Sequence, residues 1–211
     1  MKKIMFNDHY GLTEAVLSGR KTQTRRVVPR NFFTCTHDIL DNNTLVFEDM
    51  YGDWHDIRKS AYALKVGEVV AVAQSYEECG FDPNITQIWT DKGIFIFENC
   101  PISQFAGWNN KLFVRAALMP HRIRITNVRV ERLQDISDED CIKEGIYKDD
   151  GKTYFNGYAF QIVRDQYGNM LSKQWYSTPR EAYAALIDKI SGKGTWESNP
   201  YVFVYDFELV D

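Results

Sequence analysis

Cysteine is scarce in this chain. The 211 residues include four cysteines, which lie far apart and form no C-x-x-C pair: Cys35, Cys79, Cys100 and Cys141. This spacing argues against a zinc knuckle and against a disulfide framework. We therefore expect four reduced thiols in a cytoplasmic protein.

Long apolar runs are also missing. No stretch approaches the roughly 20 apolar residues that a membrane-spanning helix needs. The first residues, MKKIMFNDH, contain two lysines but no apolar run of the kind found in signal peptides. We expect no membrane partner.

An excess of positive charge is absent as well. Lysine and arginine number 25 against 29 acidic residues, which gives a net charge of −4. Proteins that bind long duplexes usually present a broad positive surface, so we expect no long duplex DNA. A nucleic-acid function would depend on a local basic patch, or on a ligand as small as one nucleotide.

The few histidines do not indicate a metal site. There are 4 of them, and no pair has the helical spacing of metal ligands: His9, His37, His55 and His121. We expect no metal and no other cofactor. Nothing in the sequence predicts the oligomeric state.

Material for a core is plentiful, since 44% of the residues are hydrophobic and 14% are aromatic. The length suits a single domain, residues 1–211. Short β-branched segments predict strands, and the longest has alternating polar and apolar residues at 121–133. Other expected strands are 3–6, 22–28, 44–48, 54–57, 69–73, 94–97 and 201–207. This order favours an α+β fold, with a mixed barrel or curled sheet and peripheral helices.

Helix signals occur in three places. The spacing of apolar residues predicts a helix near 12–17, with Asp8 as a possible cap and Gly19 at its end. Ser137 is expected to cap a second helix, and Thr178 with Pro179 to begin a third. The buried face of the third helix is expected to contain Ala182, Leu186 and Ile190. Inserted loops or hairpins are expected at about 30–64, 77–118 and 146–176.

Basic residues cluster in one segment, Gly19–Arg26, with the sequence GRKTQTRR. It follows the first predicted helix and opens a strand, so its side chains are held from both sides. Such a cluster suits a phosphate or a polarised carbonyl group. The alternative is that these are solvated charges that protect an edge strand from aggregation.

Further along the chain, Arg122 and Arg124 share one face of the long predicted strand. They either extend the basic patch of Arg25 and Arg26 or simply solvate a sheet face. Trp196 is the tryptophan best placed to stack on a base, although most tryptophans serve in packing.

The segment GRKTQTRR resembles the G-R-K-T-x-T-x-R motif of ASCH domains. Four further segments resemble those of longer, phage- and prophage-associated members of that family: 66–72, 119–123, 128–136 and 196–204. The ordered set spans both ends of the chain. The resemblance implies a PUA-like β-barrel with a cleft under the first helix.

The resemblance also implies an activity. A compact bacterial ASCH protein is an amidohydrolase that removes the acetyl group from N4-acetylcytidine. The residues that match its active site are Lys21, Thr24 and Glu144. An amide needs a nucleophile, a base and an acid for the leaving amine. Because Lys21 and Thr24 are three positions apart, a regular strand would point them to opposite faces.

Two functions are therefore expected as alternatives. The first is a cleft for a nucleoside or an RNA nucleotide, with hydrolysis of an acylated base such as N4-acetylcytidine. The second is a non-enzymatic, RNA-binding or regulatory module, as PUA-like domains often are. The candidate nucleotide-binding residues are Arg20, Arg25, Arg26, Arg122, Arg124 and Trp196.

Overall fold

A five-stranded mixed sheet forms the centre of the fold. The computed structural model describes residues 1–29, 37–39, 44–90, 93–97, 100–149, 157–160, 163–164, 170–172 and 174–210. The sheet has the order β1 (Lys3–Ile4), β6 (Val69–Val72), β9 (Arg122–Arg132), β14 (Tyr201–Val210) and β2 (Gln23–Val27). Strand β1 is parallel to β6, whereas the other neighbours are antiparallel. The fold is therefore α+β, as expected.

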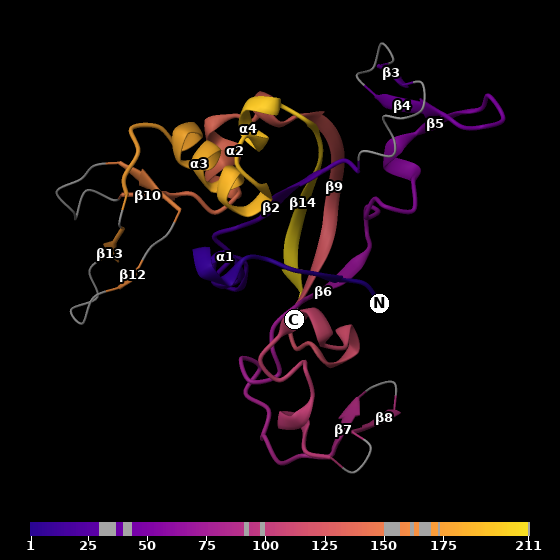
Figure 1. Cartoon of the computed structure of the whole chain (residues 1–211), viewed down its shortest axis with the longest axis vertical. Coiled ribbons are helices and arrows are strands. Elements are labelled where there is room, and N and C mark those ends of the chain that lie inside the picture. The colour runs from indigo at the N-terminus through magenta and orange to yellow at the C-terminus, as the bar shows by residue number, and fades with distance from the viewer. Residues whose placement is uncertain are drawn as a thin grey trace.

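Strands β9 and β14 are the backbone of this sheet and follow its curve (Figure 1). They pair from Tyr201↔Arg132 to Val210↔Arg122, with a register shift at Asp206/Phe207. A bulge of this kind bends a strand and increases its twist. The long strand predicted at 121–133 is confirmed. Among the described strands, the ladder ends at β1 on one side and at β2 on the other, so this sheet is open.

The helices are α1 (Leu12–Leu17), α2 (Asp138–Lys143), α3 (Pro179–Ser191) and α4 (Thr195–Ser198). Helices α2, α3 and α4 gather beside one end of the long strands (Figure 1). The Ser137 side chain accepts a hydrogen bond at the start of α2. Thr178 and Glu181 form a complete capping box at the start of α3, with Pro179 in the first turn.

Two expectations for the helices were wrong, and one short helix was missed. Helix α1 is preceded by Gly11 and has no side-chain cap. Asp8 instead accepts a hydrogen bond from the Thr13 hydroxyl, 2.5 Å away. Ile190 is 38% exposed, because Tyr183 and Ile187 complete the buried face of α3. Helix α4 was not predicted, since its four residues are too few to show a period.

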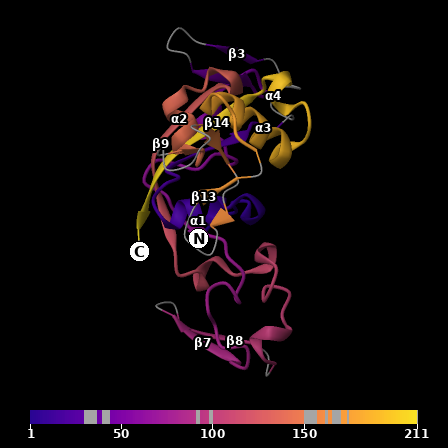
Figure 2. The same ribbon diagram turned by 90° about the vertical axis from the view of Figure 1, so that its left-hand side faces the viewer.

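Smaller hairpins lie within the three expected insertions. Strands β3 (His37–Ile39), β4 (Leu45–Glu48) and β5 (Trp54–Asp56) form one sheet, and β7 (Gln87–Thr90) pairs with β8 (Gly93–Ile96). Strand β10 (Tyr147–Lys148) pairs with β11 (Tyr158–Ala159), and β12 (Val163–Arg164) pairs with β13 (Met170–Leu171). The β7–β8 hairpin lies at the far end of the molecule from α2–α4 (Figures 1 and 2).

Two hydrophobic clusters stabilise the described structure. The larger one packs both long strands against α1, α2 and α3. The smaller one gathers Tyr76, Phe97, Ile102 and Met119 against Ala71 and Ala73, at the end of β6. The segment 77–118 therefore has a small core of its own, built onto the central sheet. Short 3-10 helices complete the chain at Asp8–Tyr10, Ile57–Lys59, Ile102–Gln104, Lys111–Phe113, Ala116–Leu118 and Leu133–Asp135.

The described residues also bear on the expected thiols and on the expected lack of a membrane-spanning helix. Cys79, Cys100 and Cys141 are free thiols, and Cys35 lies outside the described residues. No helix in the described part of the chain has the length and apolar character needed to cross a membrane.

Candidate functional site

A large cleft of about 1190 Å³ runs along strand β2. One wall is formed by α3, through Tyr183, Leu186 and Ile187. Residues Met5–His9 and Leu12 of α1 line another part, and the α4–β14 connection closes one end. Lys21, Thr24, Arg25, Arg26 and Glu144 all line this cleft. Lys21, Thr24 and Glu144 are the three residues that the sequence predicted as candidate catalytic residues.

Residues 20–22 are held against the carboxyl end of α2. The backbone N–H of Thr22 donates to Lys143 O at 2.9 Å. Lys21 Nζ donates to Glu144 O at 2.7 Å, and Arg20 Nη1 donates to Gly145 O at 2.5 Å. The last carbonyls of a helix lack partners within the helix, and positive charge is favourable there. The basic motif therefore caps α2, and this fixes the position of Lys21.

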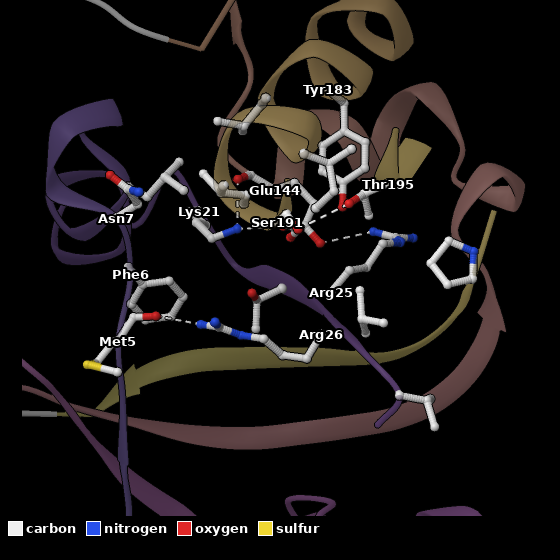
Figure 3. A pocket seen from close by; sticks show the side chains of 18 of the residues that line it. Met5, Phe6, Asn7, Lys21, Arg25, Arg26, Glu144, Tyr183, Ser191 and Thr195 are labelled. Atoms are coloured by element: carbon white, nitrogen blue, oxygen red, sulfur yellow. Dashed lines mark hydrogen bonds and ion pairs between the residues drawn. The ribbon is translucent and has the colours of Figure 1, made fainter. Parts of the chain in front are cut away.

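Lys21 and Glu144 form a buried ion pair at the floor of the cleft (Figure 3). Lys21 Nζ lies 2.6 Å from Glu144 Oε2, and their side chains are 2% and 5% exposed. Lys21 Nζ also donates to Gln23 O at 2.7 Å. Burial lowers the pKa of Lys21, and the neighbouring charge of Glu144 opposes this only in part. A lysine with a lowered pKa can serve as a base near neutral pH.

Gly145 makes this arrangement possible. Its φ of +103° lies in the region that side-chain-bearing residues rarely adopt. A Cβ added there would lie 3.4 Å from Leu12 Cδ2 and 3.5 Å from Lys21 Cδ. These are ordinary van der Waals distances, so it is the backbone conformation at the turn after α2, and not a lack of space, that favours glycine here.

Arg25 holds Glu144 from the other side. Its guanidinium contacts Glu144 at 3.2 Å, Glu131 at 2.6 Å and Asp140 at 3.0 Å, and its side chain is fully buried. Burial alone would lower the pKa of Arg25, but the charges and hydrogen bonds of these acids raise it above its ordinary value. Arg25 is thus a permanent cation that orients the Glu144 carboxylate.

A second arginine completes the ion-pair network behind the cleft. Arg129 contacts Glu131, Asp140 and Asp206 at 3.1, 2.6 and 2.8 Å. Burial opposes ionisation of Asp140, but hydrogen bonds from Arg25 and from Lys143 outweigh it and lower its pKa. Asp140, in the first turn of α2, therefore helps to hold Arg25, which in turn orients Glu144.

Thr24 lies on β2 and lines the cleft with Lys21. The concern that odd spacing would separate them applies only within one strand. Lys21 precedes β2, which begins at Gln23, so strand alternation does not govern its direction. Within the described residues, the Thr24 hydroxyl makes no side-chain hydrogen bond. It is therefore available to a ligand.

Tyr183 contributes a group that sequence reasoning missed. Its side chain is 1% exposed, it lines the cleft, and its hydroxyl has no hydrogen-bond partner among the described residues. Burial, together with the charge of Glu144, raises the pKa of Tyr183 well above its ordinary value. The hydroxyl is therefore a neutral donor without an acceptor. The sequence contained one indication of this group, because Tyr183 places a polar atom on the otherwise apolar buried face of α3.

Several sequence-predicted residues lie apart from the cleft lining. Arg20 is occupied at the end of α2, and Trp196 packs edge-on against Tyr183 at 6.2 Å. Arg122 and Arg124 lie at the far end of β9, opposite Val210 and Glu208. The Arg124 guanidinium is 3.0 Å from the Glu208 carboxylate. These arginines therefore do not form one surface with Arg25 and Arg26.

Three other cleft residues were not singled out from the sequence. Lys111 comes from the segment 77–118, and its ammonium is 2.5 Å from Asp8 Oδ2. Phe6 lies with its ring centroid 5.8 Å from Lys21 Nζ. Arg132, the last residue of β9, lines the opposite end. None had a signal, because each reaches the cleft only through the tertiary fold.

Within the described residues, no group of three or more His, Cys, Asp or Glu side chains is arranged to hold a metal ion. Comparison with protein-family models, with curated proteins and with solved structures finds no match to this chain. The candidate site therefore has to be judged on its own geometry and chemistry.

Proposed function

We propose that this chain is an ASCH-type protein of the PUA-like class that hydrolyses the exocyclic amide of an acylated nucleoside, such as N4-acetylcytidine. The observation that carries the proposal is the buried Lys21–Glu144 pair, 2.6 Å apart, at the floor of a cleft that Thr24 also lines. A buried ion pair is costly to form, so its location in a cleft favours a chemical role over a purely structural one.

The residues supply each requirement of amide hydrolysis. A water molecule, or the Thr24 hydroxyl, attacks the acyl carbon. Neutral Lys21 takes the proton from the nucleophile and passes it to Glu144 along their hydrogen bond. The C–N bond then breaks, and the leaving exocyclic nitrogen receives the proton that Glu144 holds. With water as the attacking group, the products are the carboxylic acid and the free amino nucleoside. With Thr24 as the attacking group, the acyl group first forms an ester with the threonine oxygen, and water then hydrolyses this ester to the same carboxylic acid.

Charge on the acyl oxygen also needs stabilisation as the tetrahedral intermediate forms. Arg26 lines the cleft, and its Nη2 donates to Met5 O at 2.5 Å. Its remaining N–H groups point to it as the donor to the oxyanion. Arg25 is less suited to this role because its guanidinium is committed to three carboxylates.

The proposed class also accounts for the architecture. The bent pair β9–β14, with α1 beside the cleft, is compatible with a PUA-like barrel in which the hairpins within 30–64, 77–118 and 146–176 are insertions. The described residues of these insertions leave the cleft open, and His37 of the first one lies in its lining. One of them supplies Lys111 to its wall.

The test is release of acetate from N4-acetylcytidine by the purified protein. Lys21→Ala and Glu144→Ala should each lower kcat by about a hundredfold or more, the usual scale for loss of an acid or base. Thr24→Ser should keep partial activity if the hydroxyl is the nucleophile, whereas Thr24→Val should keep activity only if water attacks. Circular dichroism shows whether each variant is folded.

A flat result across a panel of acylated nucleosides, with folded protein, would exclude the hydrolase. The non-enzymatic, RNA-binding module would then be the remaining proposal. It would have to use Arg26 rather than Arg25, because the Arg25 side chain is fully buried.

A further inference from the structure

Five lysine and arginine side chains line the cleft, and three of them are already neutralised by the protein. Lys21 is paired with Glu144, and Lys111 with Asp8. Arg25 contacts Glu144 and, from behind the cleft, Glu131 and Asp140. The two remaining cations, Arg26 and Arg132, make no ion pair within the described part of the chain.

Both free arginines are exposed to solvent, and both are positioned by the protein. Arg26 is held by Met5 O and lies with its guanidinium carbon 5.7 Å from the centroid of the Phe6 ring. The guanidinium of Arg132 lies 3.8 Å from the centroid of the Tyr201 ring, and its Nη1 donates to Asn199 O at 3.2 Å. Each guanidinium has five N–H donors, so most of them remain available.

The turn that supports Arg132 is itself unusual. Asn199 has a φ of +43°, the one positive value at a non-glycine residue in the described ranges. Its backbone carbonyl accepts from Arg132, and its side chain accepts from the backbone N–H of Gln134 at 2.8 Å. A constrained backbone that fixes an unpaired arginine is the kind of feature that marks binding sites.

The pairing register places Arg132 at a useful distance from the candidate catalytic residues. Arg132 lies opposite Tyr201, and the Val28 N–H donates to Tyr201 O at 2.9 Å. Val28 is four residues beyond Thr24, which corresponds to about 13 Å along an extended chain. Arg132 is on β9, beyond β14, but its guanidinium reaches over the Tyr201 ring of β14, which leaves a lateral offset of about 5 Å from β2. The separation is therefore on the scale of an extended nucleotide, whose base and phosphate lie at opposite ends. The backbone of Arg26 on β2 lies between them, but its side chain turns back to Met5 and Phe6, on the side of Lys21 (Figure 3).

We propose that Arg132 forms an anion subsite that binds the phosphate of a nucleotide while its base lies at Lys21, Thr24 and Arg26. The ligand is then a phosphorylated nucleotide or a residue of RNA, rather than a free nucleoside. Arg132 has no acidic partner among the described residues, so its charge is available to a phosphate monoester, which carries roughly −1.5 to −2 at neutral pH. The identity of the base rests on the proposed function, but binding at the subsite does not require hydrolysis.

The experiment measures binding of unacylated ligands by calorimetry. Cytidine, cytidine 5′-monophosphate and a short cytidine oligoribonucleotide are titrated into the wild-type protein, Arg132→Gln and Arg26→Gln. Lys189→Gln is the matched control, because it removes one exposed positive charge from α3 outside the cleft lining. In the wild type, at least one phosphorylated ligand should bind about tenfold more tightly than cytidine, equivalent to about 1.4 kcal/mol. This preference should be lost in Arg132→Gln and kept in Lys189→Gln, and it should also be kept in Arg26→Gln, which removes a charge at the base end of the cleft.

The outcomes separate the possible sources of the phosphate. A preference for the monophosphate indicates a mononucleotide, and a preference limited to the oligonucleotide indicates RNA. Equal binding of cytidine and both phosphorylated ligands, or a preference that survives in Arg132→Gln, would overturn the subsite. If acylated nucleosides are not hydrolysed but the phosphate preference depends on Arg132, the hydrolase proposal fails and the subsite stands.

Discussion

Replacing Tyr183 with phenylalanine should make the folded protein more stable, although the residue is buried in the main core. The tyrosine hydroxyl has no hydrogen-bond partner among the described residues, and a buried polar group without a partner costs about 1–3 kcal/mol. Phenylalanine keeps the ring and removes the unsatisfied atom. The expected gain is therefore about 1–3 kcal/mol in the free energy of unfolding, and about 2–4 °C in Tm for each kcal/mol in a chain of this size.

Tyr76 provides the matched control. It is 2% exposed, but its hydroxyl accepts a hydrogen bond from the backbone N–H of Arg115 at 3.0 Å. Tyr76→Phe should therefore lower stability, by about 0.5–1.5 kcal/mol for the lost bond and more if the N–H of Arg115 stays unpaired. Urea unfolding of both variants, with m-values compared to the wild type, measures the contrast.

The gain in Tyr183→Phe should come with a loss of function. Tyr183 lines the cleft, and its buried hydroxyl lies near Glu144, so removing the hydroxyl changes the surroundings of that carboxylate. We expect weaker binding of cytidine ligands and slower hydrolysis in this variant, a trade of stability against function that is common at binding sites. A variant that is destabilised like Tyr76→Phe would refute the reasoning, because the hydroxyl would then have a partner in the folded protein.

Four further predictions concern the ion pair and the neighbouring Gly145. Glu144→Gln should lower the free energy of unfolding by about 3–5 kcal/mol, because it leaves Lys21 buried without its carboxylate; chemical denaturation measures this, and a loss below about 1 kcal/mol would contradict it. Gly145→Ala should cost about 1–3 kcal/mol from backbone strain, and Gly145→Asn less than Gly145→Val, as thermal unfolding of the three variants would show. The hydrolysis rate should rise with pH through the lowered pKa of Lys21, because the base must be neutral; Lys21→Arg should be inactive without this rise. The lowered pKa of Lys21 should also make the free energy of unfolding increase with pH, in the range between the pKa of Lys21 in the folded protein and its higher pKa in the unfolded chain. In this range the unfolded chain binds a proton that the folded protein does not.

Local patterns were sufficient for much of the fold. The alternation at 121–133 predicted β9, and the Thr178–Pro179 sequence predicted the start of α3. These elements depend on periodicity and on caps, which are properties of neighbouring residues. Asp8 failed as a cap because its carboxylate is bound by Thr13 and Lys111 instead. The second of these partners comes from a segment far along the chain, and no local pattern contains it.

The site was predicted only where a motif carried it. Lys21, Thr24 and Glu144 were named from the resemblance, and all three line the same cleft. By contrast, Arg25 was expected to bind a nucleotide, because sequence alone does not show whether an arginine is paired. The three acids that occupy it come from β9 and α2. Burial and pairing depend on tertiary contacts, and these decide which cations in a basic run remain available.

The two neighbouring arginines of β2 have different partners, and this explains why a buried ion-pair network and an unpaired cation occur on the same strand. Arg25 and Arg26 are adjacent on β2, so their side chains leave opposite faces of the strand. Arg25 points to α2, where it pairs with carboxylates that include Glu144. Arg26 points to Phe6 and has no carboxylate partner among the described residues, so its charge is available in the cleft. If Arg25 faced the cleft and Arg26 faced α2, Glu144 would lose the arginine that orients it and the cleft would lose its unpaired cation. Adjacent arginines in such a motif are therefore not interchangeable, and Arg25→Gln should lower stability more than Arg26→Gln does.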